Sequence, residues 1–530
     1  MSDSKMNDAT QVYAVFGVEP EVQAYAMAKY SRSALSLKET LAEISEQSAE
    51  KFLNTFYFQY GHRSIADLAH IAMAVEKLSL LAAIILEDEQ RWDGQERSTR
   101  YQDFSHPDYY LPDFDDAPVV NKLYSAAIDF LFSEYRFFSD EMFRYLSDRT
   151  PRPDNMKEEA YERTLRARAF DIARYLLPLA TNTSLGQIVN ARTLETQVAR
   201  LLSHTHPEVR ALGRKLKEAA VTAAYNVRGG KLREALEQLQ DRDLADKLYE
   251  LTLKDVRVAP TLVKYADPNP YIMETRKELE HAARELFKDE EVETAPEVDL
   301  LDDETLEVEV PTSLLYEHCN YSYRQIRRKV VSLSAHQRAE ITALGTKHRG
   351  KHDELLRAFC AGQKFRFDVL MDVGGFRDLH RHRRCVQLHQ GFTFAHGFDT
   401  PADITAAGHA DRYSQTMQRI GEAAHKIAVA LNEEPKAKKG HNREEKDKAK
   451  VAPSYEWQYL MPLAYRKRTL FKMDLAEVAY ITELRTTPAG HFSYRNIAYK
   501  MYEAVVKRHP SLAQHMRVTD VREPVDLLKR

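Results

Sequence analysis

The feature that most constrains the fold is a seven-residue motif that occurs twice in the chain. Arg174-Tyr-Leu-Leu-Pro-Leu-Ala180 and Gln458-Tyr-Leu-Met-Pro-Leu-Ala464 agree at five of seven positions. An arginine follows the proline of each motif at a similar distance, Arg200 after 22 residues and Arg485 after 23. Self-similarity at a long, nearly fixed period indicates repeated structural units. We therefore expect two tandem copies of one fold.

Further landmarks give the period of this repeat. Asp88 aligns with Arg381 at an offset of 293 residues, and Pro178 aligns with Pro462 at an offset of 284. A period near 290 with one short deletion satisfies both. The 530 residues, 43% of them hydrophobic, are too many for one ordinary core and enough for two.

The charge pattern divides the chain further. We predict a first copy over residues 11–266, a solvated acidic linker over 267–310, made of a charged helix and then an acidic run, and a second copy over 311–530. Residues 432–453 are dominated by Lys and Glu and have few apolar side chains, so we expect a disordered insertion there. Apolar residues at helical spacing predict a long buried helix over 64–90, just before the first polar motif.

Composition excludes several classes of protein. The net charge of -4 indicates neither a nucleic-acid coat nor a membrane surface, and the longest mainly apolar run, 78–86, is too short to span a bilayer. Three scattered cysteines predict a reducing compartment, and we expect a cytoplasmic protein. His204 and His206 have no carboxylate or cysteine beside them at a familiar ligand spacing, and His389, His396 and His409 are too dispersed, so we expect no metal site.

Two polar motifs are the candidates for chemistry. The segment from Arg377 to Arg384 carries six basic side chains, which is typical of a site for phosphate or carboxylate, or else of a solvated basic patch. In the other half, Glu96, Ser98 and Arg100 alternate, so an extended segment directs all three side chains one way.

Together these motifs resemble flavin-dependent thymidylate synthases, in which Arg-His-Arg is followed closely by Glu-x-Ser-x-Arg-Tyr. Here the Arg-His-Arg motif stands in the second copy, at 381–383, and the Glu-x-Ser-x-Arg-Tyr motif in the first, at 96–101. The resemblance implies an α+β fold, with long helices and a small antiparallel sheet in each tandem copy, the two copies forming a pseudo-dimer.

The resemblance also implies a role for each matching residue. Catalysis would fall to Arg381 and Ser98. The flavin-binding residues would be His62, Arg381, His382, Arg383, Asn190 and Arg192. The residues that bind the nucleotide would be Glu96, Ser98, Arg100, Arg174, Arg377 and Arg485.

Each copy lacks what the other keeps. Asp88-Glu89-Gln90 replaces Arg-His-Arg in the first copy, whereas His389 and Gln458 stand in the second where Glu96 and Arg174 stand in the first. In the family, active sites form where subunits meet, so one complete composite site survives this pattern of loss.

The implied reaction is C5-methylation of deoxyuridylate (dUMP to dTMP), with FAD as cofactor and NADPH and methylenetetrahydrofolate as co-substrates. The family's tetramer implies a homodimer of this double-length chain. Two alternatives stay open. One is a flavin-dependent methylase of another uridine nucleotide, and the other is a non-catalytic homologue that binds nucleotide or flavin.

Overall fold

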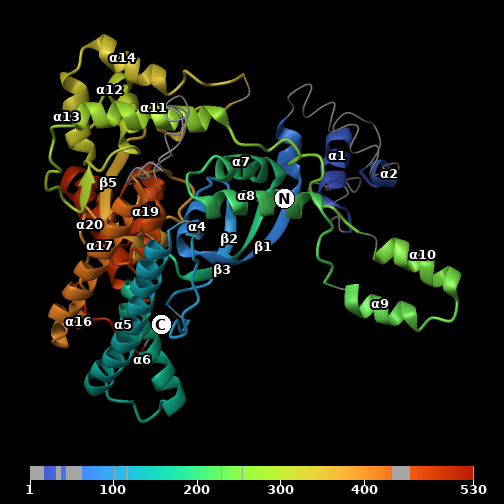
Figure 1. Ribbon diagram of the computed structural model, residues 1–530, viewed down its shortest axis with the longest axis horizontal. Coiled ribbons are helices and arrows are strands. Elements are labelled where there is room, and N and C mark those ends of the chain that lie inside the picture. The colour runs from blue at the N-terminus through green and yellow to red at the C-terminus, as the bar shows by residue number, and fades with distance from the viewer. Residues whose placement is uncertain are drawn as a thin grey trace, which may run out of the picture. The chain divides into compact units, whose positions relative to one another are not determined.

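A computed structural model describes residues 17–30, 37–42, 63–100, 102–114, 117–227, 229–253, 255–351, 353–432 and 454–528 (Figure 1). The chain divides into two compact units. Unit 1 comprises residues 1–73, 188–202 and 211–267, and unit 2 comprises 74–187, 203–210 and 268–530. The predicted insertion at 432–453 lies almost wholly outside the described residues. No described helix is both long and apolar enough to cross a membrane.

Short helices make up most of the described part of unit 1. The helices with residues in this unit are α1 (Pro20–Tyr30), α2 (Leu37–Ala42), η2 (Arg63–Leu68), α7 (Ala191–Leu202), α8 (Pro207–Val221), α9 (Gly229–Glu237) and α10 (Arg242–Thr252). Within the unit, Glu21 on α1 accepts hydrogen bonds from the backbone N–H groups of Thr261 and Leu262.

Unit 2 holds the longer helices and most of the strands. Its helices in the first half of the chain are α4 (Leu80–Leu86), α5 (Pro118–Arg149), α6 (Glu158–Ala173) and η3 (Arg174–Leu176). Those of the second half are α11 (Pro270–Phe287), α12 (Leu306–Tyr316), α13 (Tyr323–Ser332), α14 (Ala335–Leu344), η4 (Arg357–Phe359), α15 (Val373–Leu379), α16 (Ala402–Ala406), α17 (Ala410–Asn432), η5 (Glu456–Leu460), α19 (Leu475–Arg485), α20 (Phe492–Arg508) and α21 (Pro510–Ala513).

Two small sheets have matching strand orders. One has the order β1-β3-β2, with strands β1 (His70–Ser79), β2 (Asp93–Glu96) and β3 (Asn182–Asn190). The other has the order β4-β5-β7-β6, with antiparallel strands β4 (Val298–Leu300), β5 (Phe365–Asp372), β6 (Val386–His389) and β7 (Arg466–Met473). Apart from β4, both sheets place the third strand of the copy between the first two. The predicted α+β fold in two tandem copies is confirmed.

The element order repeats as well. The first copy runs β1, α4, β2, η3, β3, α7, and the second runs β5, α15, β6, η5, β7, α19, with the longest helices of each copy inserted before η3 and η5. Helix α15 and strand β6 begin where the offset between Asp88 and Arg381 places the counterparts of α4 and β2. Strand β7 begins where the offset between Pro178 and Pro462 places the counterpart of β3. Both offsets found in the sequence therefore hold in the structure.

The two proline motifs of the repeat pair with each other. Pro178 and Pro462 form an antiparallel bridge. On either side of it, Leu179 donates its backbone N–H to Met461, and Leu463 donates to Leu177. The reciprocal bonds relate the copies by an approximate two-fold axis through this bridge, the arrangement of an isologous dimer interface.

Helix starts confirm the equivalence in atomic detail. Ser79 caps α4 by accepting from the backbone N–H of Ala82, and its counterpart in the second copy, Asp372, caps α15 by accepting from Gly375. A side-chain oxygen at the N-cap satisfies one of the unpaired N–H groups of the first turn. The same backbone geometry is therefore kept with different capping residues.

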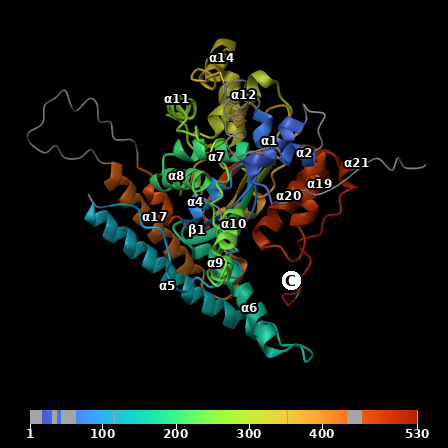
Figure 2. The same cartoon turned by 90° about the vertical axis from the view of Figure 1, so that its right-hand side faces the viewer.

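The longest helices of the two copies pack together. Figures 1 and 2 both show α17 running alongside α5, and Arg412 on α17 forms a bidentate ion pair with the buried carboxylate of Glu134 on α5. The buried face of α5 is largely aromatic and aliphatic, including Tyr124, Ile128 and Phe138. The packing of α17 against α5 is thus a second contact between the copies, in addition to the pairing at the proline bridge.

Two sequence expectations need correction. Residues 64–90 are not one helix: β1 occupies 70–79 and only α4 is helical beyond it. Residues 267–310 are not a solvated linker along their whole length. They contain α11, whose Leu279 and Phe287 belong to a hydrophobic core, and β4, which pairs with β5. The acidic side chains of that segment hid the apolar face with which its helix packs into a core.

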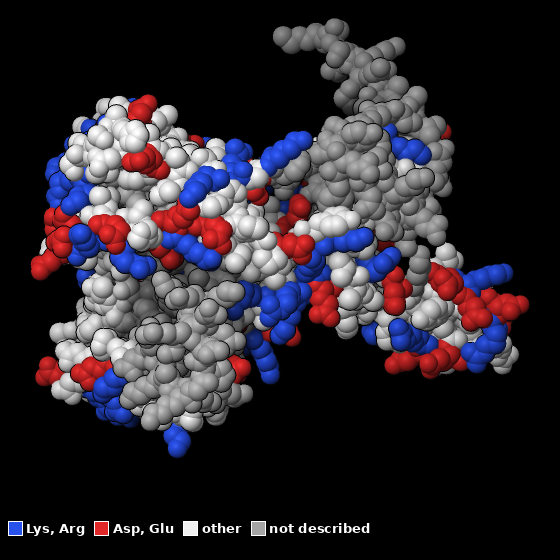
Figure 3. Space-filling model, turned by 45° about the horizontal axis from the view of Figure 1, so that its top comes forward, with Lys and Arg blue, Asp and Glu red and all other residues white. Residues whose placement is uncertain are grey.

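Charged side chains intermingle on the surface. On the face drawn in Figure 3, basic and acidic residues alternate instead of forming a field of one sign. On α13, for example, Arg324 pairs with Asp299 and Lys329 with Glu290. Mixed surface charge gives no long-range potential for a polyanion, so any anion site on this face depends on local geometry.

Candidate functional site

Structural equivalents from the two copies supply the candidate site. The C-terminal end of α4 and strand β2 of the first copy lie opposite α15 and the basic loop, residues 380–385, of the second. All of these elements belong to unit 2. Because α15 follows directly on the fully buried strand β5, its polar side chains are held on a rigid support.

A buried ion pair joins the copies. Arg377 on α15 donates through Nη2 to Oε2 of Glu96 on β2 at 2.5 Å, and their side chains are only 8% and 3% exposed. The hydroxyl oxygen of Thr99 accepts from Nη1 of Arg377 at 3.3 Å and from Nη1 of Arg174 at 3.5 Å. Arg174 also lies 3.7 Å from the Asp378 carboxylate. Two buried guanidinium groups thus meet at one hydroxyl.

Several polar atoms in this cluster lack a hydrogen-bond partner among the described residues. They are Nε and Nη2 of Arg174, Nε of Arg377, Oε1 of Glu96 and Oε1 of Glu87. Because most buried polar groups in proteins are paired, unpaired guanidinium donors favour a site that takes an anionic ligand.

Arg100 is oriented differently. Its Nε donates to Oδ1 of Asp171 at 2.7 Å, its Nη2 donates to the carbonyl oxygen of Ala489 at 3.2 Å, and its Nη1 lies 3.5 Å from the hydroxyl of Tyr494. Its guanidinium is therefore occupied by protein groups. The hydroxyl of Ser98 accepts from the backbone N–H of Arg100 at 3.2 Å and so shapes this turn.

Glu87 connects this cluster to the basic loop. Burial, together with the nearby Glu96 carboxylate, raises the pKa of Glu87 to about 7. Its Oε2 lies 3.9 Å from Nη2 of Arg383. A carboxyl group that changes charge near neutral pH inside a cluster of arginines is a common feature of functional sites.

The basic loop lines a pocket of about 440 Å³. Four of its residues, Arg381 to Arg384, share the pocket with residues of α19: Glu477, Tyr480, Leu484 and Arg485. Nε of Arg485 donates to Nε2 of His382 at 2.7 Å, so Nδ1 of that ring carries the proton and faces Glu477 at 3.5 Å. Burial lowers the pKa of His382, which keeps the ring neutral. The pocket has the cationic lining that phosphate groups require.

Arg383 lines this pocket and also contacts side chains of the first copy. Its side chain lies over the Trp92 ring at 5.3 Å from the centroid, and its Nη1 lies 3.5 Å from Nε2 of His380. Arg381, by contrast, is exposed. The two arginines of the predicted Arg-His-Arg motif therefore face different surroundings.

Three predicted cofactor residues are not among the described residues of unit 2. His62 lies outside the described residues. Asn190 caps α7 by accepting from the backbone N–H of Thr193, and Arg192 lies 3.4 Å from Asp67, all within unit 1. Their flavin role stays a prediction.

The symmetry-related location in unit 2 shows what the second copy has lost. Gln458, the counterpart of Arg174, donates to the carbonyl oxygen of Phe392, the counterpart of Thr99. Ile84 stands at the counterpart of Arg377. The contact of Arg174 with Thr99 within the first copy thus has a counterpart within the second, but the two guanidinium groups are absent from the symmetry-related location.

Sequence reasoning missed four residues of the site: Thr99, Asp171, Asp378 and Glu87. Two of them had a detectable signal, because Thr99 lies inside the Glu-x-Ser-x-Arg motif and Asp378 inside the basic run. Asp171 and Glu87 had none, since each is an acidic residue at a helix end whose importance depends on a distant arginine.

Comparison with known proteins agrees with the repeat. The family described as "Thymidylate synthase complementing protein" matches residues 16–224 and again residues 323–511. A UPF0159 protein of Chlamydia pneumoniae is 26% identical over 97% of this chain and 92% of its own length. A UPF0159 protein of Thermoplasma acidophilum is 25% identical over 93% of this chain and 94% of its own length.

Two further proteins carry a functional name. A flavin-dependent thymidylate synthase of Clostridium tetani is 26% identical over 33% of this chain and 67% of its own length. A crystal structure of the Helicobacter pylori flavin-dependent thymidylate synthase, complexed with FAD and dUMP, covers 38% of this chain and 89% of its own, with 17% identity and a TM-score of 0.26. That score is too low to carry an argument. The family match covers most of both halves of the chain, and the chain therefore belongs to the thymidylate synthase complementing protein family.

Proposed function

We propose that the chain is a flavin-dependent methylase of a uridine nucleotide, with dUMP as the first candidate substrate, at one composite site between its copies. The observation that carries this proposal is the buried contact of Glu96 and Thr99 of the first copy with Arg377 of the second. A contact between the basic segment of one copy and the Glu-x-Ser-x-Arg segment of the other supports a single shared site.

Arg174 is the residue that we assign to the nucleotide phosphate. Its side chain is only 2% exposed, and two of its donor nitrogens have no hydrogen-bond partner among the described residues. A phosphate oxygen would satisfy those donors with charge-assisted bonds. Arg100 is held by Asp171, so we assign it first to shaping the loop that carries Ser98 and Thr99.

We assign the stabilisation of charge on a uracil ring to the buried Arg377 and, by the family motif, to Arg381. Methylation at C5 moves negative charge onto the ring carbonyl oxygens, and fixed cationic donors in a dry cleft stabilise that charge. Glu96 holds Arg377 in position by the 2.5 Å contact. The protein would thus orient the nucleotide and stabilise the negative charge that develops on its ring.

The family implies FAD, and the residues of the basic loop fit it. Arg381, His382, Arg384 and Arg485 line the 440 Å³ pocket and would hold the cofactor's phosphates. When bound, FAD would supply the redox chemistry, with a folate such as methylenetetrahydrofolate as one-carbon donor and NADPH as reductant. The Glu477–His382–Arg485 chain would keep the imidazole neutral and oriented.

Two measurements test the proposal. The purified chain should show flavin absorbance, and it should release tritium from C5-labelled dUMP when supplied with the folate and reductant. Arg174→Ala should lower release sharply at dUMP concentrations below saturation, whereas Gln458→Ala, at the symmetry-related position, should retain it. Release from labelled UMP in place of dUMP would identify the ribonucleotide as substrate. A colourless chain that releases no tritium after FAD is added would contradict the proposal.

One observation favours a second candidate, a homologue that binds nucleotide without catalysis. Two of the arginines expected at the substrate, Arg100 and Arg377, are paired with protein carboxylates. A ligand would have to compete with both pairs. Calorimetry that shows dUMP binding, combined with absent tritium release in the flavin-loaded protein, would support this candidate.

A further inference from the structure

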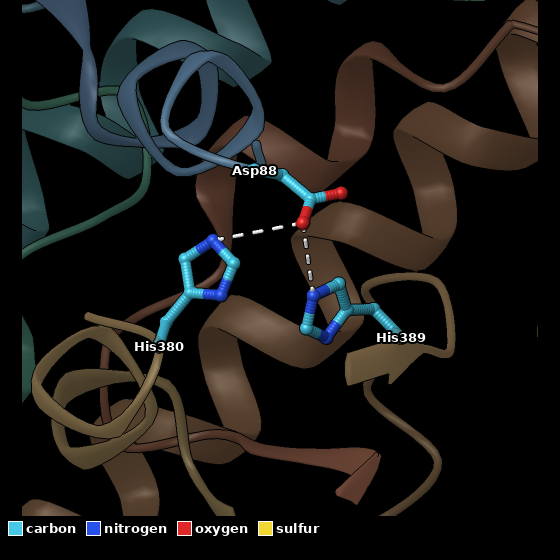
Figure 4. A group of neighbouring side chains, drawn as sticks. All are labelled: Asp88, His380 and His389. Atoms are coloured by element: carbon cyan, nitrogen blue, oxygen red, sulfur yellow. Dashed lines mark ion pairs between the residues drawn. The ribbon is translucent and has the colours of Figure 1, made fainter. Parts of the chain in front are cut away.

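Three potential metal ligands meet in unit 2, at the two-fold counterpart of the proposed substrate site. One oxygen of Asp88 and one nitrogen each of His380 and His389 all lie within 4.8 Å of one another. Figure 4 shows the Asp88 carboxylate, just beyond α4, directed at both imidazole rings, one following α15 and the other at the end of β6.

Each residue of the cluster has a counterpart at the proposed substrate site, given by the symmetry relation between the copies. By the offset that relates Asp88 to Arg381, His389 corresponds to Glu96 and His380 to Glu87. Two carboxylates and an arginine at one location are thus replaced by two imidazoles and a carboxylate at the other. The exchange removes an anion-binding group and supplies three groups that can ligate a cation.

Hydrogen bonds fix the tautomer of His380. The Gln387 amide donates through Nε2 to the carbonyl oxygen of His382 at 2.7 Å, which directs its Oε1 toward Nδ1 of His380 at 2.9 Å. Nδ1 of His380 therefore carries the ring proton, and the lone pair on Nε2 faces Asp88 at 4.0 Å. A metal-binding histidine usually has this kind of supporting partner on its other nitrogen.

His389 presents its Nε2 to the same oxygen. This atom is buried, lies 3.4 Å from Oδ1 of Asp88 and has no hydrogen-bond partner among the described residues. Its Nδ1 lies 3.5 Å from the hydroxyl of Thr469. Burial lowers the pKa of both rings, so both are neutral near pH 7 and can act as ligands.

We propose that Asp88, His380 and His389 bind one divalent transition-metal ion, of the zinc class, at this two-fold counterpart of the substrate site. Metal–ligand distances of about 2.0 to 2.2 Å give a tetrahedral edge of about 3.4 Å. The distance from Nε2 of His389 to Oδ1 of Asp88 already has that value. The distance from Nε2 of His380 to the same oxygen is 4.0 Å, and a small side-chain rotation would shorten it to that value. Three protein ligands leave one position of the tetrahedron open.

The surrounding cations limit the affinity. Arg357 contacts Oδ1 of Asp88 at 2.5 Å, Arg383 lies 3.5 Å from Nε2 of His380, and the buried ammonium group of Lys467 is also close enough to interact with Asp88. Arg357 can remain as a partner of the ligating carboxylate, but Arg383 has to turn toward Glu87, 3.9 Å away. We therefore expect micromolar affinity, weaker than that of a structural zinc site.

Untagged protein stripped with EDTA provides the test. Cobalt(II) titration should give the visible absorption of a four-coordinate ion at about one equivalent per chain, and zinc should displace it. His389→Ala should weaken binding at least about tenfold. His396→Ala, which removes a half-buried histidine of the same copy outside the cluster, should leave it unchanged.

Absence of cobalt absorption in the wild-type chain would overturn the proposal, as would equal binding by His389→Ala. If that variant does not fold, the wild-type titration decides alone, since it needs no substitution. The outcome is independent of the proposed function, because neither flavin absorbance nor tritium release enters the measurement.

Discussion

Arg377 and Glu96 come from different copies of the repeat, yet their side chains meet at 2.5 Å with almost no exposure to solvent. Their closeness depends on the two-fold arrangement around the Pro178–Pro462 bridge, since 281 residues separate them along the chain. The ion pair therefore reports on both the fold and the proposed site.

Arg377→Ala should destabilise the chain by about 3 to 5 kcal/mol, because it leaves Glu96 buried without its cation. Urea unfolding measures the loss. Arg144→Ala is the matched control: its pair with Glu141 is exposed, so its cost should stay below about 1 kcal/mol. A double variant, Glu96→Leu with Arg377→Met, should regain most of the stability. Equal losses from Arg377→Ala and Arg144→Ala would show that the buried pair is not formed in solution.

Glu87 should make stability fall as pH rises. Its folded-state pKa is raised from 4.5 to about 7, so the folded chain holds a proton that the unfolded chain has released. That contribution is complete below about pH 4.5 and is lost as pH rises through 7. Relative to Glu87→Gln, wild-type stability should drop by up to about 3 kcal/mol over this window. Unfolding curves at several pH values test it, and parallel profiles of the two proteins would contradict it.

His382→Ala should release flavin if the basic pocket holds the cofactor. The substitution removes the acceptor for Arg485 and leaves that guanidinium without its 2.7 Å contact. Because Arg485 is then no longer held in place for the cofactor, flavin binding should weaken by roughly ten- to hundredfold, as expected for the loss of one charge-assisted contact. Flavin retained after gel filtration measures the effect, with Gln458→Ala as control. Retention of flavin by His382→Ala at the wild-type level would place the cofactor elsewhere.

Arg174→Ala should weaken dUMP binding by roughly ten- to hundredfold while flavin stays bound. Gln458→Ala changes the symmetry-related side chain, which donates to a backbone carbonyl oxygen, and should have little effect on the nucleotide. Calorimetry on flavin-loaded proteins compares the two. Similar losses in both variants would mean that the second copy has a nucleotide site of its own.

The sequence predicted the repeat because the evidence for it is local: short motifs that recur in the same order at nearly constant offsets. It predicted a helix over 64–90 wrongly, because buried positions such as Ile71, Val75 and Leu78 fit helical spacing equally well when their surroundings are unknown. Tertiary pairing with β3 makes 70–79 a strand.

Part of the candidate site could likewise be predicted from the sequence, and part of it could not. The complementary losses between the copies predicted that the two polar motifs share one site, but not which side chains pair; the ion pair of Arg377 with Glu96 is seen only in the structure. The positions of Asp171 and Asp378 were not predicted either, since each depends on a contact formed only after folding. The histidines looked dispersed because ligand spacing was judged along one chain segment. The cluster instead draws Asp88 from one copy and two histidines from the other.

The hydrogen bonds at the Pro178–Pro462 bridge also bear on how this protein behaves on dilution. In a homodimer of single copies, an equivalent bridge would form in a bimolecular step, and the half-sites would separate at low protein concentration. Here one chain carries both sides, so closing the bridge is a ring closure whose entropic cost grows only slowly with the length of the intervening chain. The proposed composite site can then persist at any dilution at which the chain itself stays folded.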